Sequence, residues 1–162
     1  MLILGLDPGS RVTGWGLVRQ EGPRSVHVAS GVLRLDPEAE LATRLADLAA
    51  RLEALLRDRR PDCAALEQIF SAKSARSALV LGHARGVILA TVARAGLSVC
   101  EYTPAQVKQA VTGSGRADKG QVQRMVAILL NHRARMTEDE SDALAVALTH
   151  GAARTLLGAQ GH

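Results

Sequence analysis

The chain has 162 residues, a mass of 17.1 kDa and a formal net charge of +4, with 47% apolar and 2% aromatic residues. This length fits one domain with a core of Leu, Val, Ile and Ala, and no linker-like or low-complexity stretch indicates several domains. The pI near 9.7 fits a polyanionic partner such as nucleic acid, but many proteins without such a partner are as basic. We expect one domain over residues 1–157 and a frayed tail at 158–162.

Cysteine usage and hydropathy exclude several classes of protein. Cys63 and Cys100 lie in apolar surroundings without a Cys or His at metal-ligand spacing, so we expect reduced core thiols rather than a disulfide or zinc site. Asp7 and Arg11 interrupt the first apolar stretch, which argues against a secretory leader. The longest apolar region, 78–97, contains charged residues and is not expected to span a membrane. A cytoplasmic protein without membrane contact is predicted.

The predicted elements begin with three β-rich runs joined by the turn sequences DPGS and EGPR, which indicate an antiparallel meander. A helix follows, with Asp36 as its N-cap, Pro37 at its first position and leucines at helical spacing. Two more strands then alternate with helices. The expected strands are 2–6, 12–19, 26–35, one starting at 63, and 97–102, and the later helices are about 73–94, 104–111, 119–131 and 137–157.

This order predicts an α/β fold with a five-stranded mixed sheet. Two parallel strands reached through helices extend the antiparallel meander, and helices flank the sheet on its faces. Among common architectures, this is the ribonuclease-H-like fold.

Acidic residues stand beside apolar segments at three places in the sequence. Asp7 ends the first strand and Glu67 the fourth, while Asp139 and Asp142 share one face of the last helix. These carboxylates would meet if that helix packs near the strand ends. Because clustered carboxylates repel one another, such a site needs cations, and an oxygen-only ligand set suits Mg²⁺ or Mn²⁺. Two such ions support phosphodiester hydrolysis.

The acidic segment TEDESDAL also has an explanation without function. Acidic residues in a first helical turn favour the helix dipole, and Thr137 with Glu140 forms a capping-box pattern. This explanation accounts for Glu138 and Glu140. Asp142 lies beyond the capping positions and beside the apolar face, where an unpaired charge is costly.

Four segments resemble the bacterial Holliday-junction resolvases of the RuvC family, in the same order and with similar spacing. They are GLDPGSRVTGWG, ALEQIFSAKSARSALVLGHARG, EYTPAQVKQAVTGSGRADKGQVQRMV and DESDALAVALTH, and the resemblance covers about residues 1–151. It implies that Asp7, Glu67, Asp139 and Asp142 are catalytic residues that bind metal, with two Mg²⁺ ions for each site and Mn²⁺ as a possible substitute.

The resemblance further implies a homodimer that binds a four-way DNA junction. Such an enzyme nicks two strands of like polarity at symmetric positions and leaves 5′-phosphate and 3′-hydroxyl ends. A junction-binding protein and a branch-migration motor are the implied partners in recombination and repair.

Basic residues and one exposed ring are candidates for DNA contacts, since Lys and Arg supply salt-sensitive phosphate affinity and an aromatic ring can stack on an unpaired base. In the family, residues matching Lys108 and Lys119 support binding or catalysis, and an aromatic residue matches Phe70. Solvated surface charge and core packing of the ring are the alternatives. The predicted DNA-binding residues are Phe70, Lys73, Arg76, Lys108, Arg116 and Lys119, of which Lys119 is also predicted to be catalytic.

The helix expected over 78–93 is apolar nearly all round, too much so for a helix that covers one face of a sheet. Gly82 and Gly86 are four residues apart and permit close approach of another helix. We therefore expect it to form the two-fold interface. His83, in the same segment, is interpreted as an interface or structural residue.

Three other functions are open at this point. A ribonuclease-H-like relative that processes ribosomal RNA precursors also begins with an Asp-Pro-Gly turn, but it is shorter and lacks the LEQIFSAK and DESDAL pair. The opening also resembles the phosphate loop of actin-like ATPases, which need two such domains. A non-catalytic junction-binding module would not need all the carboxylates.

Overall fold

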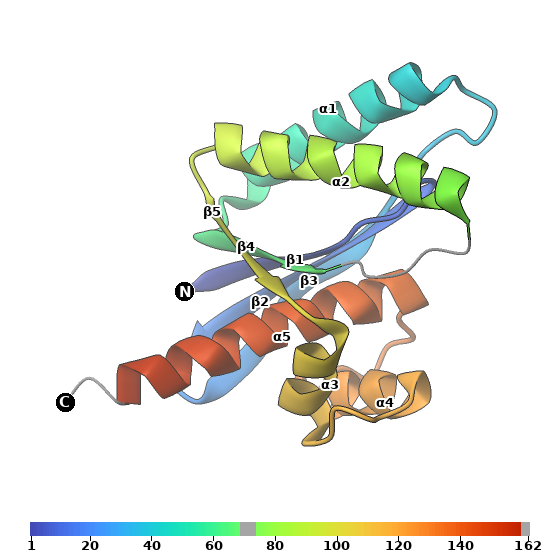
Figure 1. Cartoon of the computed structure of the whole chain (residues 1–162). Coiled ribbons are helices and arrows are strands. Elements are labelled where there is room, and N and C mark those ends of the chain that lie inside the picture. Colours follow the sequence, from blue (N-terminus) through green and yellow to red (C-terminus); the bar gives the residue numbers. More distant parts are fainter. Residues whose placement is uncertain (69–73, 160–162) are drawn as a thin grey trace.

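The computed structural model describes the backbone of residues 1–68 and 74–159, and the side chains in these ranges up to residue 155. Within this part, five strands form one sheet in the order β3-β2-β1-β4-β5, with helices on both faces (Figure 1). The strands are β1 (Leu2–Asp7), β2 (Val12–Glu21), β3 (Arg24–Arg34), β4 (Cys63–Glu67) and β5 (Ser98–Tyr102). The helices are α1 (Leu41–Arg59), α2 (Ala75–Arg94), α3 (Pro104–Thr112), α4 (Lys119–Leu129) and α5 (Glu138–Ala159).

The pairing of the strands confirms the predicted mixed sheet. β1, β2 and β3 are antiparallel neighbours, whereas β1 with β4 and β4 with β5 are parallel. Parallel strands finish at the same edge of a sheet. Because Leu6 pairs with Leu66, the two residues that follow, Asp7 and Glu67, lie beside each other at that edge.

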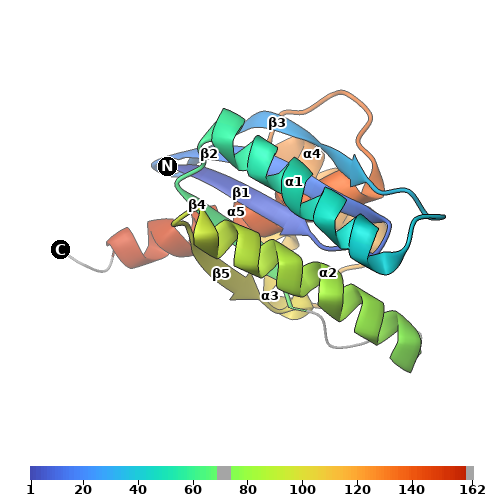
Figure 2. The ribbon, with the colours of Figure 1, turned by 90° about the horizontal axis from the view of Figure 1, so that it is seen from above.

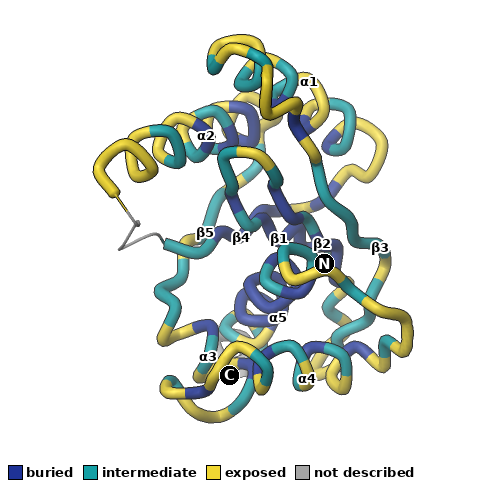
Figure 3. Tube along the Cα trace, turned by 90° about the vertical axis from the view of Figure 1, so that its right-hand side faces the viewer, coloured by how far each residue is buried: buried dark blue, intermediate teal, exposed yellow. Residues whose placement is uncertain are grey.

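The helices form two layers of different character. α1 and α2 lie side by side across one face of the sheet (Figure 2), and α5 runs along the other, flanked by α3 and α4. α5 is buried along most of its length, whereas α1 and α2 have exposed outer faces (Figure 3). Among the described residues, α5 is therefore the most completely enclosed helix.

Side-chain alternation along β1 and β4 assigns each residue to one of these layers. Leu4, Leu6 and Leu66 pack in the cluster beneath α1 and α2, while Ile3 and Ala65 pack against the opposite cluster, which contains residues of α5. Asp7 and Glu67 continue the second series. Both carboxylates consequently project to the face that α5 covers.

The start of α1 differs from the prediction. α1 begins at Leu41 with Glu40 as N-cap, not at Pro37 after Asp36. The Asp36 carboxylate instead accepts a hydrogen bond from the Glu38 N–H at 2.9 Å, which forms a turn. The same side-chain chemistry that caps a helix also closes such a turn, so the local pattern was ambiguous.

Other boundaries shift by only a few residues. α2 begins at Ala75, where the Ser74 hydroxyl accepts a hydrogen bond from the Ser77 N–H, and the backbone of α5 continues to Ala159. Residues 160–162 of the predicted tail lie outside the described residues. In the described part of the chain, no helix combines the length and hydrophobicity needed to cross a membrane.

Candidate active site

The site begins at the carboxyl-terminal edge of two parallel strands. Asp7 and Glu67 are the last residues of β1 and β4, and both are half-buried. A carboxylate attached to the end of a paired strand is held more accurately than one on a loop. The sheet therefore holds two carboxylate groups in fixed positions on the α5 face.

α5 brings the second pair of carboxylates to this edge, and a glycine of β2 makes the approach possible. Gly14 pairs with Asp7, and a Cβ added at Gly14 would overlap the backbone carbonyl group of Asp139. Gly5 similarly faces the carbonyl of Ala143. Without side chains at these positions, the first turns of α5 lie directly on β1 and β2. Asp139 and Asp142 thus lie beside the strand ends.

A capping box fixes the beginning of α5. The Glu140 N–H donates to the Thr137 hydroxyl at 3.3 Å, and the Glu140 carboxylate accepts from the Thr137 N–H at 2.9 Å. The predicted capping role of Thr137 and Glu140 is confirmed. Glu140 also accepts a hydrogen bond from the Ser30 hydroxyl at 3.3 Å, which connects the helix start to β3.

The carboxylates perturb one another electrostatically. Burial, followed by the charges of Asp142, Asp139 and Glu67, raises the pKa of Asp7 from its ordinary 3.8 to about 7. Burial and then the charge of Asp142 raise the pKa of Glu67, and burial also raises that of Asp142. Such mutual elevation of pKa is typical of a functional cluster that requires a cation.

Two lysines face this negative charge. The Lys119 ammonium lies 3.1 Å from Asp142 Oδ2 and also contacts Glu138. Its hydrogen bond and its charge offset part of the elevation of the Asp142 pKa that burial causes. The charges of Lys108 and Lys119 oppose the elevation at Glu67. Lys119 is the first residue of α4 because Asp118 caps this helix through a capping box.

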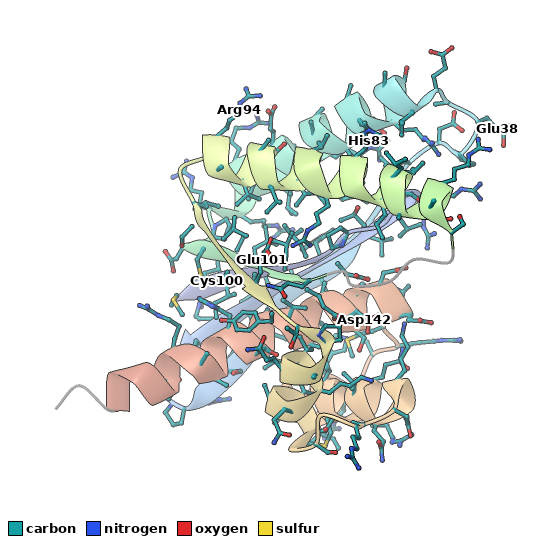
Figure 4. The ribbon with its side chains drawn as sticks, viewed as in Figure 1. Glu38, His83, Arg94, Cys100, Glu101 and Asp142 are labelled. Carbon is teal, nitrogen blue, oxygen red and sulfur yellow. The ribbon has the colours of Figure 1, made fainter. Side chains whose placement is uncertain are left out.

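A hollow of about 280 Å³ lies between these groups, where α3, α4 and α5 meet the end of β4. Figure 4 shows Asp142 near the start of α5, beside α3 and α4. Both charged and aliphatic side chains line the hollow. The lining residues are Glu67, Pro104, Val107, Lys108, Lys119, Val122, Asp142 and Ala145.

The donor chemistry of the cluster fits a hard divalent cation. Carboxylate oxygens are the preferred ligands of Mg²⁺ and Mn²⁺. After burial, the charges of the neighbouring carboxylates are the next largest causes of the raised pKa of Asp7, and the charge of Lys119 opposes them. Among the described residues, no three Asp, Glu, His or Cys side chains are close enough together to form a ready-made cage.

The remaining predicted contacts lie farther out or outside the described part. Arg76 is exposed in the first turn of α2, and Arg116 is exposed between α3 and α4. Arg116 lines a separate groove of about 520 Å³ with Arg124. Phe70 and Lys73 belong to residues 69–73, which lie outside the described residues.

Sequence reasoning missed three contributors to this region. Glu138 was explained by the helix dipole alone, although it contacts Lys119. Gly14 was quoted within a motif but given no role, and Arg85 was noted only as a charge in an apolar region. Arg85 donates a hydrogen bond to the backbone carbonyl of Glu67 at 2.8 Å. No local pattern signals these contacts, because each joins distant segments.

Comparisons with known proteins identify the family. A sequence profile described as crossover junction endodeoxyribonuclease RuvC matches residues 3–150. The chain is 48% identical over 150 residues to the protein of that name from Sphingopyxis alaskensis, covering 93% of this chain and 96% of the relative. It is 51% identical over 148 residues to the Caulobacter vibrioides protein of the same name, with coverage of 91% and 88%.

A solved structure supports the same relationship. T. thermophilus RuvC in complex with a Holliday junction substrate matches with a TM-score of 0.91 at 32% sequence identity, covering 96% of both chains. The ribonuclease-H-like fold expected from the sequence is confirmed by this match and by the strand order. The comparisons support the junction endonuclease rather than the three other functions that the sequence left open. The chain belongs to the RuvC family of crossover junction endodeoxyribonucleases.

Proposed function

We propose that this endonuclease resolves four-way DNA junctions by metal-dependent hydrolysis at the site formed by Asp7, Glu67, Asp139 and Asp142. The observation that carries the proposal is the convergence of two strand carboxylates and two carboxylates of α5 at one edge of the sheet. Each pair comes from a rigid element, so the site is fixed by the fold rather than by a loop.

These carboxylates would hold Mg²⁺, with two ions expected and Mn²⁺ as a substitute, and the bound metal would activate a water and stabilise the leaving oxygen. The chain's own residues hold and orient the DNA. Lys119 presents its ammonium beside Asp142, where we expect it to contact a phosphate oxygen near the bond that breaks. Attack of water on the phosphorus breaks the bond to the 3′ oxygen, which takes up a proton. The products carry a 5′-phosphate and a 3′-hydroxyl.

Positive side chains around the hollow support contact with the DNA backbone. Lys108 lines the hollow itself, while Arg116 lies on the neighbouring connection between α3 and α4. Such residues add sequence-independent affinity that falls as salt rises. Arg76, Lys73 and the ring of Phe70 complete the proposed contacts, with Phe70 stacking on a base near the crossover.

The outer face of α2 supports the proposed homodimer. Leu79 on this face is 63% exposed, which is unusual for a large aliphatic residue. Nothing in the described part of the chain lies within 4 Å of a Cβ added at Gly82 or Gly86, so a second helix can approach there. A two-fold pair of chains would provide the two active sites that symmetric nicking requires.

Partners beyond DNA and a second copy follow from family membership. We expect a junction-binding protein and a branch-migration motor to stimulate cleavage of a mobile junction. Adding both proteins from a bacterium that contains a close relative should raise the rate of resolution.

The proposed activity is tested with a mobile four-way DNA junction, a linear duplex of the same sequence and an RNA hairpin, each with Mg²⁺ or EDTA. We expect paired nicks in the junction alone, only with Mg²⁺. Equal cutting of linear duplex, or preference for the RNA hairpin, would contradict the proposal.

The role of the carboxylates is tested by Asp142→Asn. Because even supporting groups of metal sites contribute about 10- to 100-fold, we expect loss of a ligand to lower the cleavage rate by more than about 100-fold. Junction binding in EDTA should persist, since the proposed phosphate contacts lie on other residues. A folded variant that cuts normally would remove Asp142 from the site.

The proposed stacking role of Phe70 is tested by Phe70→Ala. We expect slower junction cleavage with an unchanged Mg²⁺ requirement, because stacking affects the DNA and not the ions. Full activity would assign the ring to packing.

A further inference from the structure

Arg85 connects α2 to the edge of the sheet that carries the active site. Its side chain is only 16% exposed, although Arg85 lies on α2 between the exposed residues His83 and Gly86. One guanidinium nitrogen, Nη1, donates to the carbonyl oxygen of Glu67 at 2.8 Å. The other, Nη2, donates to the carboxylate of Glu101 and forms an ion pair with it.

Both acceptors lie at the ends of neighbouring strands. Glu101 pairs with Leu66 in the β4–β5 ladder, and Glu67 with Tyr102. Figure 4 shows Glu101 on β5, below α2. One planar group therefore joins α2, β4 and β5 through two hydrogen bonds in a fixed fork, an arrangement that only arginine provides.

The hydrogen bond to Glu67 acts where the sheet ends. The Gln68 N–H still donates to the Tyr102 carbonyl at 2.7 Å, and no further β4–β5 pair follows within the described residues. The Glu67 carbonyl and the Gln68 N–H belong to one peptide group, so the hydrogen bonds from Arg85 and to Tyr102 together hold that plane. They thereby restrain the backbone that sets the direction of the Glu67 Cα–Cβ bond. Arg85 holds this plane from the α2 face, while the carboxylate of Glu67 reaches the opposite face.

We propose that Arg85 is a positioning residue that orients Glu67 for metal binding by holding the carbonyl at the end of β4. This inference rests on the proposed function, because it requires Glu67 to be a ligand. Through this contact, a residue of α2, the proposed dimer helix, controls the geometry of a carboxylate that it does not touch.

Two variants weaken this connection to different degrees. Arg85→Met removes both hydrogen bonds and keeps an unbranched aliphatic side chain. Glu101→Gln removes only the ion pair and leaves the bond to the Glu67 carbonyl. Arg94→Met is the matched control, because Arg94 lies on the same helix, is 79% exposed and pairs with Glu53 instead, at 3.8 Å.

The decisive measurements are Mn²⁺ affinity of the protein alone, by calorimetry, and the Mg²⁺ concentration for half-maximal junction cleavage. Supporting groups of metal sites contribute about 10- to 100-fold, so we expect Arg85→Met to weaken Mn²⁺ binding about 10-fold and to raise the Mg²⁺ midpoint similarly. Junction affinity in EDTA should stay within about two-fold of the parent. Arg85→Lys should recover part of the loss, and Arg94→Met should match the parent.

If Arg85 only stabilises the fold, the variants should show different activity and metal-binding results. Activity would then fall in proportion to the unfolded fraction, with an unchanged Mg²⁺ midpoint and Mn²⁺ affinity, and this result would overturn the inference. If Arg85→Met does not fold, Glu101→Gln decides, with an expected shift of about two- to three-fold in the same direction and no shift as the contrary result.

Glu67→Gln separates failure of this inference from failure of the proposed function. If Glu67→Gln is inactive while Arg85→Met keeps its metal affinity and midpoint, only the positioning role is wrong. If Glu67→Gln cuts normally, the proposed metal site itself is wrong and the role of Arg85 falls with it.

Discussion

Asp7 combines burial with repulsion from the neighbouring carboxylates. Its carboxylate is enclosed by the sheet and α5, and the charges of Asp142, Asp139 and Glu67 add to the cost of burial. These effects hold its pKa near 7, against an ordinary 3.8, so the metal-free folded state binds a proton that the unfolded chain has lost. Stability therefore falls as pH rises between about pH 4 and pH 7.

The raised pKa predicts the behaviour of Asp7→Asn. Since Asn cannot ionise, the metal-free variant should exceed the parent in free energy of unfolding at pH 8 by on the order of 2 kcal/mol, and the difference should shrink toward pH 4. Urea unfolding in EDTA at several pH values measures this. Adding Mg²⁺ at pH 8 should stabilise the parent more than the variant, which should not cut junctions. A pH-independent difference would contradict the assignment.

Lys119 is the complementary case, a cation among carboxylates. Its ammonium contacts Asp142 and Glu138, and we propose that it also meets the DNA. For Lys119→Met we expect at least about a 10-fold slower cleavage and a salt dependence of junction binding reduced by about one phosphate contact. Lys119→Arg should restore binding more fully than cleavage, because the guanidinium keeps the charge but not the compact geometry. Unchanged salt dependence in Lys119→Met would exclude a phosphate contact.

At the scale of elements, the docking of α5 on β1 and β2 decides whether the site exists. The contact at Gly14 involves backbone atoms of Asp139, which cannot rotate away as a side-chain end would. A methyl group there must shift the first turn of the helix. The strand carboxylates and the helix carboxylates would then separate.

We expect Gly14→Ala to destabilise the protein by about 1–3 kcal/mol, as overpacking does. The cleavage rate should fall by more than the decrease in the folded fraction explains. Thermal unfolding and junction cleavage measure the two effects. Gly86→Ala is the control for stability alone, because Gly86 lies on the proposed dimer face. Its added Cβ has no described atom within 4 Å beyond the nearby backbone of its own helix, and replacing a helical Gly should stabilise by about 0.5–1 kcal/mol. Equal stability of the parent and Gly14→Ala would show that the helix is not held this closely.

At the scale of the whole molecule, the outer face of α2 is available for a second copy of the chain. Leu79 is exposed there beside the open positions of Gly82 and Gly86. A symmetric interface on this face would be abolished by charge, because each substitution appears twice across the two-fold axis.

We expect Leu79→Glu combined with Gly86→Glu to give a folded monomer by light scattering at concentrations where the parent is a dimer. The monomer should lose paired incision and retain at most slow, single nicks. Its Mn²⁺ affinity should be little changed, since the carboxylates all come from one chain. A variant that remains dimeric and cuts in pairs would place the interface elsewhere.

Local signals in the sequence predicted the order of elements and the carboxylates of the candidate site. Alternation, helical spacing and turn residues are local signals, and they predicted a mixed sheet that the strand pairing confirms. Asp7 and Glu67 were recognisable because a charge at the end of an apolar strand is locally anomalous. The start of α1 was the exception, because Asp36 can close a turn as well as cap a helix.

How these groups meet depends on contacts between distant segments of the chain. Parallel pairing of β1 with β4 places two distant carboxylates at one edge, and Gly14 lets α5 deliver the others. Lys119 reaches Asp142, and Arg85 reaches the Glu67 carbonyl, through contacts between segments far apart in the chain. Such contacts depend on packing and register across the sheet, which no window of neighbouring residues encodes, and they set both the raised pKa of Asp7 and the orientation proposed for Glu67.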